Sequence, residues 1–84
     1  MKDMIQYKKT LDFFGPEFEG ILKAIFKGQE TLSLQDLKEN SKEHASLLAE
    51  KEDQMMYLCA EKMLWPGDLP VDNFIGLCIA STNQ

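Results

Sequence analysis

His44 is the single histidine of the chain, so a reaction that needs a general base or a metal ligand near neutral pH would start from this residue. Ser41 and Glu43 lie too close to it in the sequence to complete a nucleophile–base triad. The sequence also lacks the HExxH and paired ExxH spacings of metal-dependent enzymes. We therefore predict no catalytic residue, and hence a protein that is not an enzyme.

Cys59 and Cys78 are the two cysteines, and both lie in apolar segments without a CxxC spacing or a flanking histidine pair. Residue preferences for burial favour two reduced thiols in the core. The alternative is one structural disulfide in a secreted domain. Neither arrangement supplies the four ligands of a zinc site, so we predict no metal and no cofactor.

The formal net charge of −5 comes from 14 acidic residues and nine basic residues, all of which are lysine. Most sequence-specific nucleic-acid readers depend on the bidentate contacts of arginine. An acidic chain without arginine is therefore predicted not to bind nucleic acid. Paired acids such as Glu39 and Glu43 are typical of a solvated helix face and not of an acid–base site.

The hydropathy pattern argues against membrane contact. No apolar run approaches the roughly 18 residues that a membrane-spanning helix needs. The first residues, MKDMIQYKKTLDFF, carry acids and lysines where a signal peptide would be apolar. We therefore expect a cytoplasmic protein.

Methionine and aromatic residues cluster in the second half of the chain. Met55 and Met56 point about 100° apart on a helix, so the apolar arc there is wider than one neighbouring helix covers. Core filling is the usual role of such methionines, but part of this arc is expected to remain available for a protein contact. The predicted contact residues are Met55, Met56, Tyr57 and Trp65, with His44 and Lys51 at the rim.

An alternative function is the binding of a small anion such as a nucleotide. In an oligomer, cationic and hydrogen-bonding side chains of adjacent subunits could converge on one ligand. The residues predicted for this site are Tyr7, Lys38, Lys42 and His44.

The elements that would position these residues are helices. In the first of them, Asp3 caps a helix that ends near Phe14, and Gly15-Pro16 separates it from a second, amphipathic helix around Phe18 to Phe26. Thr31 or Ser33 begins the next element.

No glycine or proline occurs from Leu34 to Trp65, and strong helix formers fill the interval. One helix over about 33–65 would be about 48 Å long, whereas a compact chain of this size is roughly 30 Å across. If the helix breaks, the expected places are Asn40-Ser41 and Glu50 to Asp53. If it is continuous, its excess length is best covered by a second copy of the chain.

The carboxyl-terminal residues 70–80 read either as a helix or as a buried strand, and helix is favoured because no partner strand is evident. We therefore predict a single all-α domain over residues 1–84 with three to four helices. Two short N-terminal helices pack on one long helix (about 33–65), followed by a short C-terminal helix. By elimination, the predicted function is protein–protein interaction by a small acidic regulator, adaptor, chaperone or inhibitor that forms a homo-oligomer, most simply a dimer.

Overall fold

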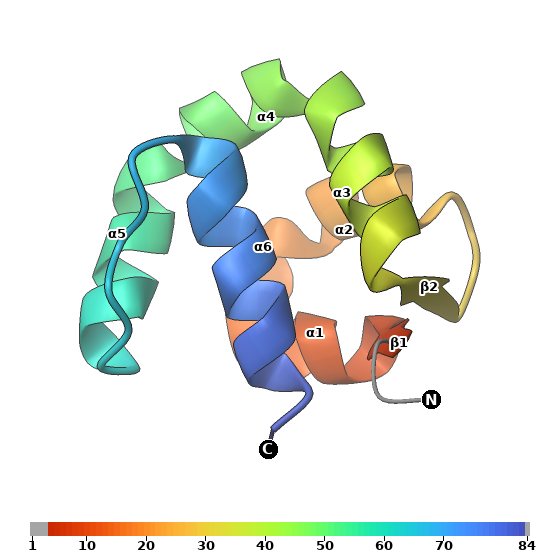
Figure 1. Ribbon diagram of the computed structural model, residues 1–84, viewed down its shortest axis with the longest axis horizontal. Coiled ribbons are helices and arrows are strands. Elements are labelled where there is room, and N and C mark those ends of the chain that lie inside the picture. The colour runs from red at the N-terminus through yellow and green to blue at the C-terminus, as the bar shows by residue number, and fades with distance from the viewer. Residues whose placement is uncertain (1–3, 84) are drawn as a thin grey trace.

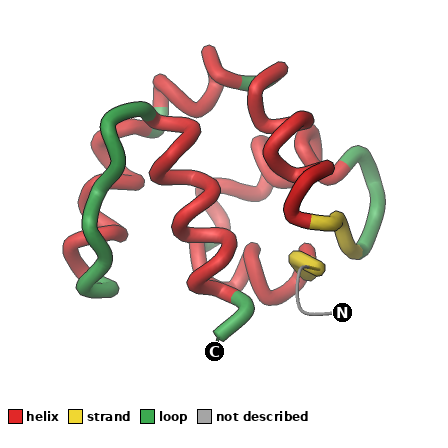
Figure 2. The backbone as a smooth tube through the Cα atoms, viewed as in Figure 1, coloured by secondary structure: helices red, strands yellow, loops and turns green. Residues whose placement is uncertain are grey.

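A computed structural model describes residues 4–83, and within this range the chain forms six α-helices, one 3₁₀ turn and a two-stranded sheet (Figures 1 and 2). The elements in chain order are β1 (Met4–Gln6), α1 (Tyr7–Phe14), the 3₁₀ turn η1 (Pro16–Phe18), α2 (Glu19–Phe26), β2 (Thr31–Ser33), α3 (Leu34–Glu43), α4 (Ala45–Glu50), α5 (Glu52–Glu61) and α6 (Pro70–Ser81). The prediction of a mainly helical chain is confirmed. The predicted number of helices is wrong.

Helix α6 lies at the centre of the molecule and packs against α1, α3, α4 and α5 (Figure 1). Its sequence is apolar around most of its circumference, and Phe74, Leu77 and Cys78 are fully buried. Pro70 occupies its first turn, where the missing N–H leaves no hydrogen bond unmade. The prediction of a helix for this segment is confirmed.

The predicted long helix over 33–65 is wrong, because the segment is divided into α3, α4 and α5. The backbone leaves helical geometry at His44 (φ −110°, ψ 24°) and at Lys51 (φ −104°, ψ 12°). At each break the amide bonds a carbonyl three residues back, from His44 to Ser41 at 3.0 Å and from Lys51 to Leu48 at 3.0 Å. The second break falls inside the interval expected from the sequence, and the first lies just beyond Asn40-Ser41.

The two breaks let three apolar clusters reach one core. Leu37 on α3, Leu48 on α4 and Met55 on α5 are all fully buried, although polar residues separate them along the chain. The three helices form an arc around α6 (Figure 1), and the molecule measures 27 × 27 × 22 Å. A straight helix of about 48 Å would have carried most of these side chains away from the core.

The first break comes after Ser41, whose hydroxyl is hydrogen-bonded inside the last turns of α3. Ser41 is fully buried and donates to the carbonyl oxygen of Lys38 at 3.0 Å. The imidazole Nδ1 of His44 lies 3.0 Å from the carbonyl oxygen of Asn40 in the last turn of α3. The polar stretch KENSKEH therefore ends a helix and supplies its carboxyl-terminal hydrogen bonds.

The small sheet is absent from the sequence prediction. Strands β1 and β2 are antiparallel, with Ile5 opposite Leu32, and both of these side chains are buried. The amide of Tyr7 extends the pairing by donating to the carbonyl of Glu30 at 2.8 Å. Helix α1 consequently begins at Tyr7, so the expected helix start near the amino terminus is wrong for residues 4–6. Asp3, its expected cap, lies outside the described residues.

The predicted division between the first two helices is confirmed at Gly15-Pro16. Gly15 has φ 105°, a conformation that favours glycine, and Pro16 begins η1. This corner brings Phe14 to 4.9 Å from Phe18 and to 5.4 Å from Phe74, measured between ring centroids. The phenylalanines therefore join the amino-terminal helices to α6.

Candidate functional site

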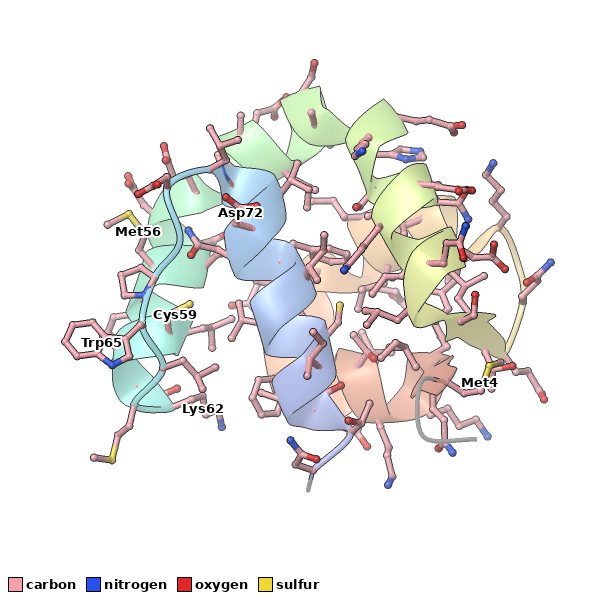
Figure 3. All side chains as sticks on the ribbon, viewed as in Figure 1. Met4, Met56, Cys59, Lys62, Trp65 and Asp72 are labelled. Atoms are coloured by element: carbon pink, nitrogen blue, oxygen red, sulfur yellow. The ribbon has the colours of Figure 1, made fainter. Side chains whose placement is uncertain are left out.

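Large apolar side chains remain in solvent on α5 and on the segment 62–69 that follows it. Trp65 is 96% exposed, Met63 90%, Tyr57 69%, Leu69 60% and Met56 47%. Figure 3 shows Met56 and Trp65 projecting away from the body on the same side of the molecule. We call these five residues the α5-loop surface.

Helix α5 presents two different faces. Met55 and Cys59 are buried, and Cys59 points from α5 toward α6 (Figure 3). Met56 and Tyr57 are 47% and 69% exposed and therefore lie on sides of the helix that face solvent. The wide apolar arc expected from the sequence is present, and the core covers only part of it.

The segment after α5 has a defined backbone that begins with a helix-ending motif. The amide of Leu64 donates to the carbonyl of Cys59 at 2.7 Å, and the amide of Met63 donates to the carbonyl of Ala60 at 3.2 Å. This pair of bonds is the Schellman motif, whose central residue adopts the left-handed conformation and is usually glycine. Here that residue is Met63, with φ 61°. Leu64 packs against the core, so Met63 and Trp65 on either side of it are turned outward.

The far end of the segment is held by α6. The buried side chain of Asn73 accepts a hydrogen bond from the amide of Gly67, and Asp72 Oδ2 accepts one from the amide of Leu69 at 3.3 Å. A β-carbon on Gly67 would lie 2.6 Å from the β-carbon of Asp72, so this close approach requires glycine. Trp65 is therefore displayed from a segment that is fixed at both ends.

Negative charge is concentrated around this surface. Residues 50–72 contain six acids (Glu50, Glu52, Asp53, Glu61, Asp68 and Asp72) and two lysines, which gives −4 of the total −5. The two lysines lie over aromatic rings of the N-terminal half: Lys51 Nζ is 5.6 Å from the ring centroid of Phe18, and Lys62 Nζ is 5.0 Å from that of Phe13. Cation–π attraction thus holds both ammonium groups toward the body.

The structure separates the residues predicted for a protein contact. Met56, Tyr57 and Trp65 belong to the α5-loop surface. Met55 must be removed from the predicted set, because it is fully buried and fills the core beneath α5. His44 and Lys51, placed at the rim by the sequence, lie at the two helix breaks.

Sequence reasoning missed Met63 and Leu69 as exposed apolar residues, and it missed Asn73 as the residue that holds the segment. A signal for the first two was present. Met63 and Leu69 flank the helix-breaking pair Pro66-Gly67, so both lie in or beside a turn where burial is difficult. The role of Asn73 depends on a tertiary contact and left no trace in the sequence pattern.

The residues of the predicted anion site do not converge within one chain. Tyr7 lines a cavity of about 650 Å³ together with Lys8, Lys23 and Phe26, and its ring packs edge-on against Phe26 at 5.4 Å. The remaining members, Lys38, Lys42 and His44, lie on or at the end of α3 and are not among the lining residues of this cavity.

The two cysteines are free and buried. Burial raises the pKa of the Cys78 thiol well above its ordinary value, and burial also raises the pKa of Cys59. Neither thiol is therefore activated as a nucleophile. Among residues 4–83, no three histidine, cysteine or acidic side chains are grouped so that they could hold a metal ion.

Comparisons with protein-family models, curated proteins and solved structures gave no match to this chain. In the described part of the chain, no helix has both the length and the apolar character required to cross a bilayer. The candidate site therefore stands on its own geometry.

Proposed function

We propose that this protein is a small acidic interaction module, acting as a regulator or adaptor, that binds another protein through the α5-loop surface. The observation that supports the proposal most strongly is the exposure of Trp65 and Met63, at 96% and 90%. Large apolar side chains that remain this exposed on a small folded domain are typical of an interaction site. Tryptophan and tyrosine are also the side chains that most often dominate the binding energy of interfaces.

The fixed backbone of the segment 62–69 adds to this argument. An exposed tryptophan on a frayed loop would lose conformational freedom on binding, which weakens the complex. Here the hydrogen bonds at Leu64 and Gly67 hold the backbone on both sides of Trp65. The surface is therefore organised before a partner arrives.

The proposed partner is a different protein. The prediction of a homo-oligomer depended on a helix too long for its own body, and that helix is broken into three. A twofold dimer across the α5-loop surface would also place two regions of −4 charge against each other. Self-association remains a prediction that light scattering tests directly.

A position-specific crosslinking experiment tests the proposal. A photoreactive benzophenone amino acid is placed at position 65 or, as a control, at the exposed position of Lys9 on α1. In extract from the source cells, we expect a discrete crosslinked product from position 65 alone, and its loss when Met56 and Tyr57 are both replaced by serine. Equal products from both positions, or a product that survives the double substitution, would contradict the proposal.

A further inference from the structure

We infer that the α5-loop surface docks a basic amphipathic helix of its partner, with apolar residues along one side and lysine or arginine along the flanks. This inference rests on the proposed function and specifies the chemistry of the partner. It follows from the arrangement of charge around the exposed apolar side chains.

Carboxylates and apolar side chains share the outer side of α5. Tyr57 has Asp53 four residues before it and Glu61 four residues after it, and residues four apart lie on the same helix face. Met56 has Glu52 four residues before it. All three acids are exposed, and none of them has an ion-pair partner within residues 4–83. A partner that covers Met56 and Tyr57 must therefore meet three free carboxylates.

The lysines of the same region do not neutralise these carboxylates. Lys51 and Lys62 lie over the rings of Phe18 and Phe13, which belong to η1 and α1. Cationic side chains from a partner can supply the missing positive charge at the rim of the interface. Opposite charge at the rim raises the association rate and excludes partners of the wrong sign.

Methionine and tryptophan suit such a partner for separate reasons. Methionine has three flexible side-chain torsions and a polarizable sulfur, so Met56 and Met63 can adapt to the apolar face of a helix. The exposed indole of Trp65 offers the aromatic face that lysine and arginine contact most favourably. Docking of an amphipathic helix through its apolar face is a recurring mode of peptide binding.

The same charges disfavour two other occupants. A second copy would bring a net −4 against a net −4 across a twofold contact. An anionic lipid surface attracts polybasic segments and would repel residues 50–72. Both occupants are outcomes that the experiment below distinguishes.

Three model peptides test the inference. Each is about 18 residues long, which gives five helical turns, and has leucine on one face and a single polar residue type on the other. The polar residue is lysine, glutamine or glutamate, and none of the peptides contains tryptophan. Because Trp65 is the only tryptophan of the protein, its fluorescence reports contact at the surface, and calorimetry gives the affinity.

We expect the lysine peptide to bind and to shift Trp65 emission to the blue, the glutamine peptide to bind at least about tenfold more weakly, and the glutamate peptide not to bind. Equal binding of the lysine and glutamine peptides would overturn the inference and leave the proposed function standing. If no peptide binds but position 65 still crosslinks to a protein, the inferred partner class is wrong. If the crosslink is also absent, the proposed function fails as well.

A pair of charge variants shows whether binding depends on this surface or only on net charge. Asp53→Asn with Glu61→Gln removes two charges beside Tyr57, and we expect lysine-peptide affinity to fall about threefold to tenfold. Asp12→Asn with Glu39→Gln removes two exposed charges on α1 and α3 and should change affinity by less than about twofold. Equal losses in the two variants would overturn the inference. Binding to anionic vesicles, or a dimer by light scattering that is lost on Trp65→Ser, would overturn it too.

Discussion

Replacing Met63 with glycine should stabilise the protein and weaken its contact surface at the same time. Met63 has φ 61° at the end of α5, and its side chain is 90% exposed, so the side chain contributes little packing. A side chain in the left-handed conformation costs about 1–2 kcal/mol, and glycine adopts this conformation freely. Glycine is also more flexible in the unfolded chain, which reduces the gain in folding stability by about 0.5–1 kcal/mol.

The midpoints of these two ranges leave a net gain of about 0.75 kcal/mol for Met63→Gly, which corresponds to a rise in Tm of about 3–6 °C for a domain of this size. Thermal and urea unfolding followed by circular dichroism measure it. Met63→Ala is the matched control, because it removes the thioether side chain but keeps the strained backbone. Its stability should stay within about 0.5 kcal/mol of the original protein.

A second control is Lys27→Gly, since Lys27 ends α2 with φ 52°. Its gain should be smaller, because the variant also loses the exposed ion pair between Lys27 Nζ and Glu43 Oε2 at 3.5 Å, worth at most about 1 kcal/mol. In peptide binding, Met63→Gly and Met63→Ala should lose affinity equally. An unchanged or lowered Tm for Met63→Gly would refute the account of the helix end, and unchanged peptide affinity in both variants would remove Met63 from the surface.

Three further predictions concern the core, the thiols and the alternative ligand. Met55→Ala should lower the free energy of unfolding in urea by about 2–5 kcal/mol, because this side chain is fully buried. Met56→Ala should lower it by less than about 0.5 kcal/mol, because that side chain is 47% exposed. Similar losses in the two variants would contradict the orientation of α5. Burial raises the pKa of Cys78, so the folded state keeps a proton that the unfolded state loses above about pH 8.5. This contribution to stability is present below that pH and declines as the pH rises further. Under reducing conditions, the free energy of unfolding should therefore fall less steeply with rising pH in Cys78→Ala than in the original protein. An equal decline in that variant would show that other groups cause it. Nucleotides at saturating concentration should leave Tm unchanged if the α5-loop surface is the functional site, whereas a shift of several degrees would support the anion-binding alternative.

The sequence predicted those parts of the fold that depend on local chemistry. The corner at Gly15-Pro16, the amphipathic α2 and the helix after Pro70 follow from residue type and spacing alone. Ser33 likewise accepts a hydrogen bond from the amide of Asp36 at 3.1 Å, as a helix cap would. In these places local preference and tertiary packing agree.

The errors arose where tertiary contacts decided the outcome. Local preference permits a helix through His44 and Lys51, but burial of Leu48 and Met55 in the same core requires two bends. Strands of three residues are too short to show the alternation by which a strand is detected, so β1 and β2 were invisible. Tyr57 and Trp65, which the sequence indicated as contact residues, are exposed, whereas Met55 is buried. The sequence shows a wide apolar arc around Met55 and Met56 but does not show which side of that arc faces the core.

Trp65 is 96% exposed and lies among acidic residues, and quenching of its fluorescence measures both properties directly. The measurement compares acrylamide, caesium and iodide at low ionic strength, with free N-acetyltryptophanamide as the reference. We expect acrylamide to quench Trp65 nearly as efficiently as the reference. We also expect the ratio of caesium quenching to iodide quenching to be higher for the protein than for the reference. Protection from acrylamide, or a preference for iodide, would contradict the exposed, acidic-rimmed surface on which the proposed function depends.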